Sequence, residues 1–172
     1  MHPKHCLLRF LLQVIKGVFT VEGIGAVLYA FAFIPKYNVP KGIWFSVFHS
    51  ISAFCNAGID ILGPDSLIPF AHDPWVLIVT MLLIIVGGLG YFVWFDISTS
   101  VSHFGKYASR EDKRLSEHSR TVLLLTAALI ASGAVLVFLF EKNNPATIGS
   151  FSFGEKLLHS LFQSVTFRTA GF

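Results

Sequence analysis

The chain is poor in charged residues. Only 13% of its 172 residues are charged, whereas 53% are hydrophobic and the mean hydropathy is +0.66. Soluble globular domains are about one quarter charged, so this composition excludes an ordinary soluble enzyme or carrier domain. It is typical of a protein that lies in a lipid bilayer.

Cysteine and concentrated positive charge are scarce as well. The two cysteines, Cys6 and Cys55, are predicted at opposite ends of the membrane depth, which argues against a disulfide framework. The net charge of +3 is small and dispersed, which argues against binding to nucleic acid. The seven histidines form neither a His-x-x-x-His nor a His-Glu-x-x-His motif, so we expect neither a metal site nor a cofactor.

Three long apolar runs predict transmembrane helices. Residues 76–95 and 122–140 contain no charge, and each run has about the 20 residues that a helix needs to cross the hydrocarbon core. A third run, residues 7–34, is long enough to span but is interrupted by three charged side chains. We expect its cytosolic end near Lys16, which places Glu22 near the middle of the helix.

Lysine and arginine are distributed unevenly over the segments that join these runs. Residues 103–120 contain five of them and residues 60–75 contain none, whereas residues 34–44 and 141–157 contain two each. Because cytoplasmic loops are enriched in Lys and Arg, residues 103–120 are predicted to form a cytoplasmic linker. The first helix would then run outward, the second inward and the third outward.

Two segments of the chain resemble one another. Residues 48–59 and 162–172 each follow a long apolar run, and each ends in Ala-Gly plus an apolar residue. The stretch before each Ala-Gly is too short to span, which favours a half-helix that dips into the membrane and returns as extended backbone. We predict the half-helices at residues 45–54 and 155–166.

The predicted fold is therefore an all-α membrane protein built from repeats of transmembrane helix, reentrant pore loop and transmembrane helix, with three transmembrane helices and two pore half-helices. Residues 1–102 form the first repeat, residues 103–120 the linker, and residues 121–172 an incomplete second repeat. Both repeats start on the same side of the membrane, so they can be arrayed around one axis normal to it. An axis surrounded by pore loops is typical of a channel.

The two Ala-Gly segments contain the residue types of a cation filter. Backbone carbonyls can replace the hydration shell of an ion, and Gly58 and Gly171 lack the Cβ that would forbid the necessary backbone angles. The C-terminal ends of the half-helices would add partial negative charge. A simpler interpretation of either copy is a left-handed cap that ends a buried helix. The residues predicted to offer carbonyls are Asn56, Ala57, Gly58, Thr169, Ala170 and Gly171.

These motifs resemble those of a known family. The chain is similar to the membrane subunit of the Trk/Ktr/HKT potassium-transport superfamily, above all to KtrB-like and TrkH-like proteins. Three residues depart from the pattern of that family. Cys55 stands where asparagine is common, Ile59 where phenylalanine often follows the glycine, and Phe167 where proline or a small residue is frequent. The resemblance is carried by the stretches Phe48-His-Ser-Ile-Ser-Ala-Phe-Cys-Asn-Ala-Gly58, Gly87-Gly-Leu-Gly90 and Phe162-Gln-Ser-Val-Thr-Phe-Arg-Thr-Ala-Gly-Phe172.

The resemblance implies a function and a set of partners. Members of the superfamily have four linked helix-loop-helix units around one pore, and this chain would hold the second unit and part of the third, with Gly58 and Gly171 as filter glycines. The implied function is transport of K+ across the plasma (inner) membrane, with Na+ as a candidate coupling ion. The implied partners are the remaining repeats, a second full subunit in a homodimer, a cytosolic nucleotide-binding regulatory subunit and the lipid bilayer.

Several side chains are candidates for supporting the loops. Glu22 either anchors a loop beside the pore or is a protonated or snorkelling residue. Arg168 either braces the second loop through hydrogen bonds or faces the outer vestibule. His49, on the first half-helix, is expected to make a structural hydrogen bond. The glycines within residues 87–90 are expected to let helices pack closely.

Three other functions compete with potassium transport. An enzyme is not expected, because no nucleophile and base lie at a workable spacing. A non-conducting assembly subunit or a degenerate fragment is favoured if the reading frame ends at Phe172 with no remainder nearby. A sodium-selective member of the same superfamily is also consistent with the sequence, because selectivity depends on all four loops together.

Overall fold

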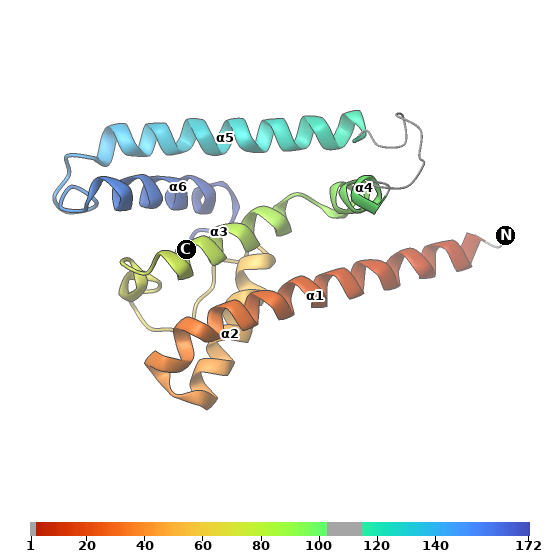
Figure 1. Cartoon of the computed structure of the whole chain (residues 1–172), viewed down its shortest axis with the longest axis horizontal. Helices are drawn as coiled ribbons and strands as arrows, with labels where there is room; N and C mark the ends of the chain where they lie inside the picture. Colours follow the sequence, from red (N-terminus) through yellow and green to blue (C-terminus); the bar gives the residue numbers. More distant parts are fainter. Residues whose placement is uncertain (1–2, 103–114) are drawn as a thin grey trace. The chain divides into compact units, whose positions relative to one another are not determined.

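The computed structural model describes residues 3–102 and 115–172, so most of the predicted linker 103–120 lies outside the described residues. Every regular element within the described residues is helical, as the sequence predicts. The chain divides into two compact units, Met1–Gly87 with Thr166–Phe172, and Gly88–Val165. The elements, labelled in Figure 1, are α1 (Pro3–Tyr37), α2 (Val39–Phe54), the short helix η1 (Ile68–Phe70), α3 (Pro74–Gly88), α4 (Tyr91–Ser102), α5 (Glu117–Glu141) and α6 (Phe153–Thr169).

The first unit begins with a helical hairpin made of α1 and α2. The apolar part of α1, Leu8–Tyr37, is long enough to cross a membrane, as predicted. Asn38 separates the two helices at a φ of +75°. Its side chain accepts a hydrogen bond from the backbone N–H of Lys41 at 3.3 Å and so caps the N-terminus of α2. The chain therefore reverses at a single residue, and α2 packs against α1 (Figure 1).

Aromatic side chains fill the space between α1, α2 and α3. Tyr29 and Phe33 of α1 are fully buried and stack with their ring centroids 5.2 Å apart. His49 of α2 is also fully buried, and its ring lies edge-on to Phe33 at 5.3 Å. The hydroxyl of Tyr29 is hydrogen-bonded to Thr80 of α3 at 2.6 Å. Because such a core is close-packed, it holds α2 firmly against α1 and α3.

The second predicted transmembrane run is interrupted in the structure. Helix α3 ends at Gly88 and α4 begins at Tyr91, with Gly90 between them at a φ of +84°. A residue in this left-handed conformation ends an α-helix, so residues 76–95 form parts of two helices instead of one. Helices α1 and α5 are each long and apolar enough to cross a membrane, and the bent pair of α3 and α4 provides a third crossing when it is counted as one span.

The second unit contains α4, α5 and most of α6. Ser116 caps α5 by accepting a backbone N–H at 3.2 Å. Ser152 and Glu155 form a capping box at the start of α6, in which the Glu155 carboxylate accepts the Ser152 backbone N–H at 2.9 Å. Helix α6 then runs beside α5 (Figure 1), and the ring of Phe153 lies edge-on to that of Phe138 at 5.9 Å.

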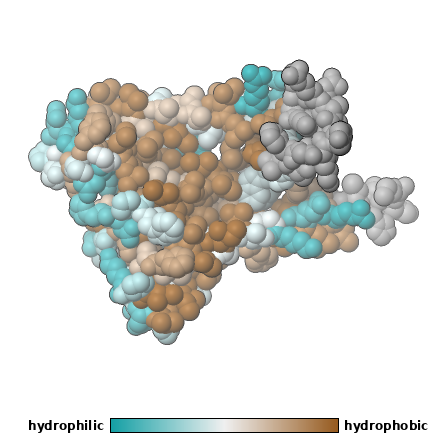
Figure 2. Space-filling model, viewed as in Figure 1, coloured by the Kyte–Doolittle hydropathy of each residue, from teal (hydrophilic) through white to brown (hydrophobic). Residues whose placement is uncertain are grey.

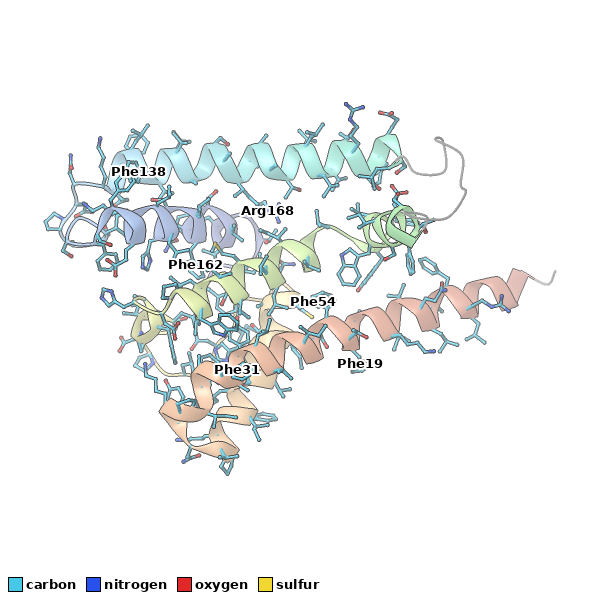
Figure 3. The ribbon with its side chains drawn as sticks, in the orientation of Figure 1. Phe19, Phe31, Phe54, Phe138, Phe162 and Arg168 are labelled. Atoms are coloured by element: carbon cyan, nitrogen blue, oxygen red, sulfur yellow. The ribbon has the colours of Figure 1, made fainter. Side chains whose placement is uncertain are left out.

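Large apolar side chains are exposed on several helices. Figure 2 shows hydrophobic residues over much of the face in view. Phe19 and Phe31, labelled on α1 in Figure 3, are 71% and 68% exposed. Only 6% of the most apolar 18-residue stretch of α5 is buried. Apolar exposure on this scale marks contact with lipid or protein, so the structure agrees with the predicted all-α membrane fold.

Candidate functional site

Both predicted half-helices are present in the structure. Helix α2 contains the predicted residues 45–54 and begins earlier, whereas α6 contains residues 155–166 and extends further at both ends. The earlier starts follow from capping, because Asn38 and Ser152 each satisfy backbone N–H groups that a helix leaves free at its first turn.

Each half-helix is tied to the preceding long helix by the same kind of hydrogen bond. The Ser50 hydroxyl on α2 donates to the Glu22 carbonyl of α1 at 2.6 Å, and the Ser164 hydroxyl on α6 donates to the Ile130 carbonyl of α5 at 2.8 Å. The two serines hold the same place in the repeated sequence, two residues after the phenylalanine that opens each copy. One hydroxyl therefore anchors the half-helix in both repeats.

Glycine makes room for this hydrogen bond in both repeats. Gly25 and Gly133 each lie three residues after the residue whose carbonyl accepts the bond. A Cβ on Gly25 would collide with the hydroxyl oxygen of Ser50, and a Cβ on Gly133 would collide with that of Ser164. The sequence interpretation missed these four residues, although the serine shared by the two copies was a signal that could have found half of them.

The two loops also close in the same way. Each turn contains a backbone hydrogen bond of 2.9 Å to the carbonyl of Ser52 or Thr166. The hydroxyls of these two residues then reach the residue that follows each predicted filter glycine. The Ser52 hydroxyl donates to the Ile59 carbonyl at 2.5 Å, and the Thr166 hydroxyl oxygen accepts the Phe172 backbone N–H at 2.7 Å. The first loop holds one more residue than the second. Even so, Ser52 and Thr166, which hold the same position in the two copies, make the closing bonds of both loops.

Gly58 and Gly171 have the unusual backbone conformation that the sequence predicts for them. Their φ angles are +63° and +80°, in the left-handed region that glycine adopts without a steric penalty. Asn56 also lies in this region, at +54°, and asparagine tolerates it better than most residues do. Each chain segment therefore turns sharply at its Ala-Gly, directly after the C-terminal end of a half-helix.

The two Ala-Gly segments meet within the first unit. The Thr169 hydroxyl donates to Oδ1 of Asn56 at 2.8 Å, although the two residues are 113 positions apart in the sequence. Gly58 lies so close to the Ala170 carbonyl that a Cβ on Gly58 would overlap the carbonyl oxygen. A Cβ on Gly171, by contrast, would meet no atom of the described residues within 4 Å. The six residues predicted to offer carbonyls therefore lie together, and their role in binding an ion stays a prediction.

The three predicted supporting side chains have different surroundings. Glu22 is half-buried, and the Cys55 thiol donates a weak hydrogen bond to one of its carboxylate oxygens at 3.9 Å. His49 is fully buried, and its Nδ1 is paired with the Phe45 carbonyl at 2.9 Å, which is the expected structural hydrogen bond. Arg168 lies in the last turn of α6 (Figure 3), and its buried Nε has no hydrogen-bond partner among the described residues.

Helix α3 packs against the end of α2 through a glycine. A Cβ on Gly87 would overlap the carbonyl oxygen of Phe54, the last residue of α2, and would lie 3.3 Å from Nδ2 of Asn56. Gly87 therefore allows close packing, as the sequence predicts. Gly90 has a different role, because a Cβ there would meet none of the described atoms within 4 Å and its positive φ ends the run of helix.

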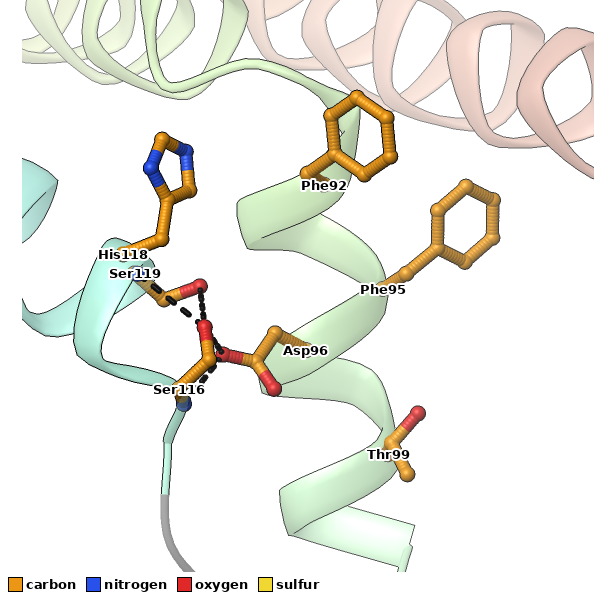
Figure 4. A pocket seen from close by; sticks show the side chains of 7 residues that line it. All are labelled: Phe92, Phe95, Asp96, Thr99, Ser116, His118 and Ser119. Atoms are coloured by element: carbon orange, nitrogen blue, oxygen red, sulfur yellow. Dashed lines mark hydrogen bonds between the residues drawn. The ribbon is translucent and has the colours of Figure 1, made fainter.

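A separate cavity of about 540 Å³ lies in the second unit and is lined by residues of α4 and of the start of α5 (Figure 4). Asp96 of α4 accepts hydrogen bonds from the backbone N–H and the hydroxyl of Ser116, each at 2.8 Å. The carboxylate therefore helps to cap α5, at the positive end of the helix dipole. Within the described residues, no three His, Cys, Asp or Glu side chains are grouped closely enough to hold a metal ion.

The repeated architecture is accompanied by sequence similarity along nearly the whole chain. The sequence profile of the TrkH family, described as cation transport proteins, matches residues 7–172. The chain belongs to the TrkH family. Its half-helices and Ala-Gly turns lie within the region that the family model matches.

Three relatives of this TrkH-family chain show how much of the complete proteins it represents. The potassium/sodium uptake protein NtpJ of Enterococcus hirae is 39% identical over 166 residues, which cover 96% of this chain and 34% of the relative. The Ktr system potassium uptake protein B of Bacillus subtilis is 39% identical over 153 residues, covering 89% and 32%. The protein of the same name from Vibrio alginolyticus is 34% identical over 166 residues, covering 96% and 35%. The chain therefore spans about one third of the length of these curated relatives.

Proposed function

We propose that this chain supplies two neighbouring segments of the ion filter in a monovalent-cation transporter, with K+ as the transported ion. The observation that carries the proposal is the contact of the two Ala-Gly segments, in which Thr169 bonds to Asn56 and Gly58 lies against Ala170. A pore made from repeated units needs equivalent turns that converge on one place. The names of the relatives support the choice of ion, because they are potassium uptake proteins.

The filter would bind its ion through backbone oxygens. Carbonyl groups directed at a common axis replace the water that a cation loses when it enters a pore. Helices α2 and α6 both end at the proposed filter, and the partial negative charge of a helix C-terminus favours a cation over an anion. The six residues that would offer the carbonyls have uncharged side chains: Asn56, Ala57, Gly58, Thr169, Ala170 and Gly171.

The complete transporter would contain more than this chain. Because the relatives are about three times as long, we propose that the remaining repeats supply the other filter segments and close the pore. The full subunit would lie in the plasma membrane as a homodimer, with residues 103–120 in the cytoplasm beside a nucleotide-binding regulatory subunit. The term "Ktr system" in the names of the Bacillus subtilis and Vibrio alginolyticus relatives supports an assembly of several components.

The variant Gly58→Ser in the complete transporter tests the proposed filter. The added Cβ would overlap the Ala170 carbonyl, and the serine would have to adopt a positive φ. The turn could therefore not keep its shape. We expect K+ uptake, or its discrimination against Na+, to change at least about tenfold, equivalent to about 1.4 kcal/mol.

A matched control separates this effect from a general loss of folding. Gly154→Ser makes the same chemical change in the exposed first turn of α6, where a Cβ meets none of the described atoms within 4 Å, and it should transport normally. Normal K+ uptake and ion discrimination by both Gly58→Ser and Gly171→Ser, at normal protein levels, would contradict the proposal.

Sodium is the second candidate for the transported ion. One relative with 39% identity is named a potassium/sodium uptake protein, and a filter of carbonyls can be adjusted to either ion. Uptake of K+ and Na+ measured side by side in the same cells decides between them. A Na+ flux that exceeds the K+ flux at equal concentrations would favour the sodium-selective alternative.

A further inference from the structure

The side chain of Asn56 connects three parts of the first unit. Its Oδ1 accepts the Thr169 hydroxyl at 2.8 Å, and its Nδ2 donates to the Phe54 carbonyl at 3.4 Å. A Cβ on Gly87 would lie only 3.3 Å from the same Nδ2. The amide therefore bonds to the end of α2 and to the second Ala-Gly segment, and it lies beside α3. In this orientation the amide oxygen faces a donor and the amide nitrogen faces an acceptor, so both groups of the side chain are hydrogen-bonded.

We propose that Asn56 and Thr169 form a latch between the two Ala-Gly segments that sets the spacing of their carbonyls, and with it the preference of the filter for K+ over the smaller Na+. The latch rests on the proposed function, because it acts on the filter. Asn56 and Thr169 are positioning residues in this proposal. They act through the backbone, and neither side chain needs to touch the ion.

Two features make the latch specific to this contact. The hydrogen bond joins side chains 113 residues apart, one from each Ala-Gly segment, so it ties the two segments to one another and not a loop to itself. Next to it, Gly58 lies against the Ala170 carbonyl with no space for a Cβ. A polar link and a steric contact thus hold the two segments at one separation. A K+ ion is larger than Na+, so a latch that keeps the carbonyls of the two segments from moving closer would disfavour the smaller ion.

The hydroxyl of Thr169 can be removed almost without a change in shape. Thr169→Val in the complete transporter deletes the donor and keeps the branched side chain, whereas Thr169→Ser keeps the donor and deletes a methyl group. We expect Thr169→Val to lower the ratio of K+ to Na+ uptake about 2- to 10-fold, the range that a neutral hydrogen bond spans. We expect Thr169→Ser to keep the ratio. Thr121→Val is the control, because it makes the same change on α5, where the hydroxyl donates to the carbonyl of Glu117 within its own helix.

A second variant tests whether the two residues act together. Asn56→Gly removes the amide but still permits the positive φ of this position. We expect Asn56→Gly to lower the K+/Na+ ratio as Thr169→Val does, and Thr169→Val to add little in the Asn56→Gly background, because a shared interaction is lost only once.

The outcomes separate the latch from the filter itself. If Thr169→Val and Asn56→Gly keep the wild-type ratio while Gly58→Ser changes it, the latch is wrong and the filter stands. If Gly58→Ser and Gly171→Ser also transport normally, the proposed function fails as well. If Thr169→Val does not accumulate in the membrane, Asn56→Gly decides alone, and a wild-type ratio in that variant overturns the latch.

Discussion

At the scale of residues, Gly58 and Gly171 take the same turn in different surroundings. Both have a positive φ, so both positions disfavour any residue with a Cβ. Only at Gly58 would that Cβ also meet the backbone of the other Ala-Gly segment, because the position at Gly171 is open within the described residues. The two glycines therefore share a backbone conformation, but only Gly58 also makes a close contact with the other Ala-Gly segment.

Alanine at each position separates these two effects. Both Gly58→Ala and Gly171→Ala should destabilise the complete protein by about 1–2 kcal/mol through the left-handed backbone alone. Gly58→Ala should lose more, because its methyl group cannot avoid the Ala170 carbonyl. The measurement is the thermal stability of each purified variant in detergent. Equal losses at the two positions would show that the Gly58–Ala170 contact is absent in the complete protein.

At the scale of elements, the half-helices depend on a serine and a glycine that face each other. Ser50 bonds to a carbonyl of α1 and Ser164 to a carbonyl of α5, and a glycine three residues further along each long helix leaves room for the hydroxyl. The pair recurs in both repeats with the same geometry. It therefore explains how a short half-helix is held in place against a long apolar helix.

Two glycines on α1 provide a matched test of this packing. Gly25 is buried and a Cβ there would meet Ser50 and Leu83, whereas Gly23 is exposed and a Cβ there would meet none of the described atoms within 4 Å. Gly25→Val should therefore destabilise the complete protein by about 1–3 kcal/mol through overpacking. Gly23→Val makes the same change in helix propensity without that cost. A similar thermal stability of the two variants in detergent would contradict the role of Gly25.

At the scale of the whole molecule, the described helices expose extensive apolar surface. Only 6% of the most apolar stretch of α5 is buried, and the chain spans about one third of the length of its curated relatives. Exposure of this kind is typical of helices that contact lipid or further protein. The orientation predicted from Lys and Arg places the start of α5 in the cytoplasm and its end outside.

Thiol labelling in intact cells tests this orientation. With Cys6 and Cys55 replaced by serine, Asn143→Cys should react with a membrane-impermeant reagent added outside. His118→Cys should react only after the cells are permeabilised. Both side chains are exposed, so burial does not account for a difference between them. Labelling of His118→Cys in intact cells, with no labelling of Asn143→Cys, would reverse the predicted orientation.

Local features of the sequence predicted much of the candidate site. The half-helices, the positive φ at Gly58 and Gly171 and the hydrogen bond of His49 all depend on residues near one another in the chain. The interruption before Tyr91 was missed, because hydropathy reports how apolar a run is and not whether its backbone stays helical. The bonds of Ser50 and Ser164 were missed because their acceptors lie on another helix.

The sequence by itself determined that this is a helical membrane protein with two copies of a half-helix and an Ala-Gly turn. Composition, apolar run length and glycine position act locally, so they can be interpreted without a fold. Only the tertiary structure decided that Asn56 meets Thr169 and that Gly58 lies against Ala170. The physical reason is that the packing of α2 against α1 and α3, together with the direction of the last turn of α6, sets the distance between the two turns. The chain separates these turns by more than one hundred residues.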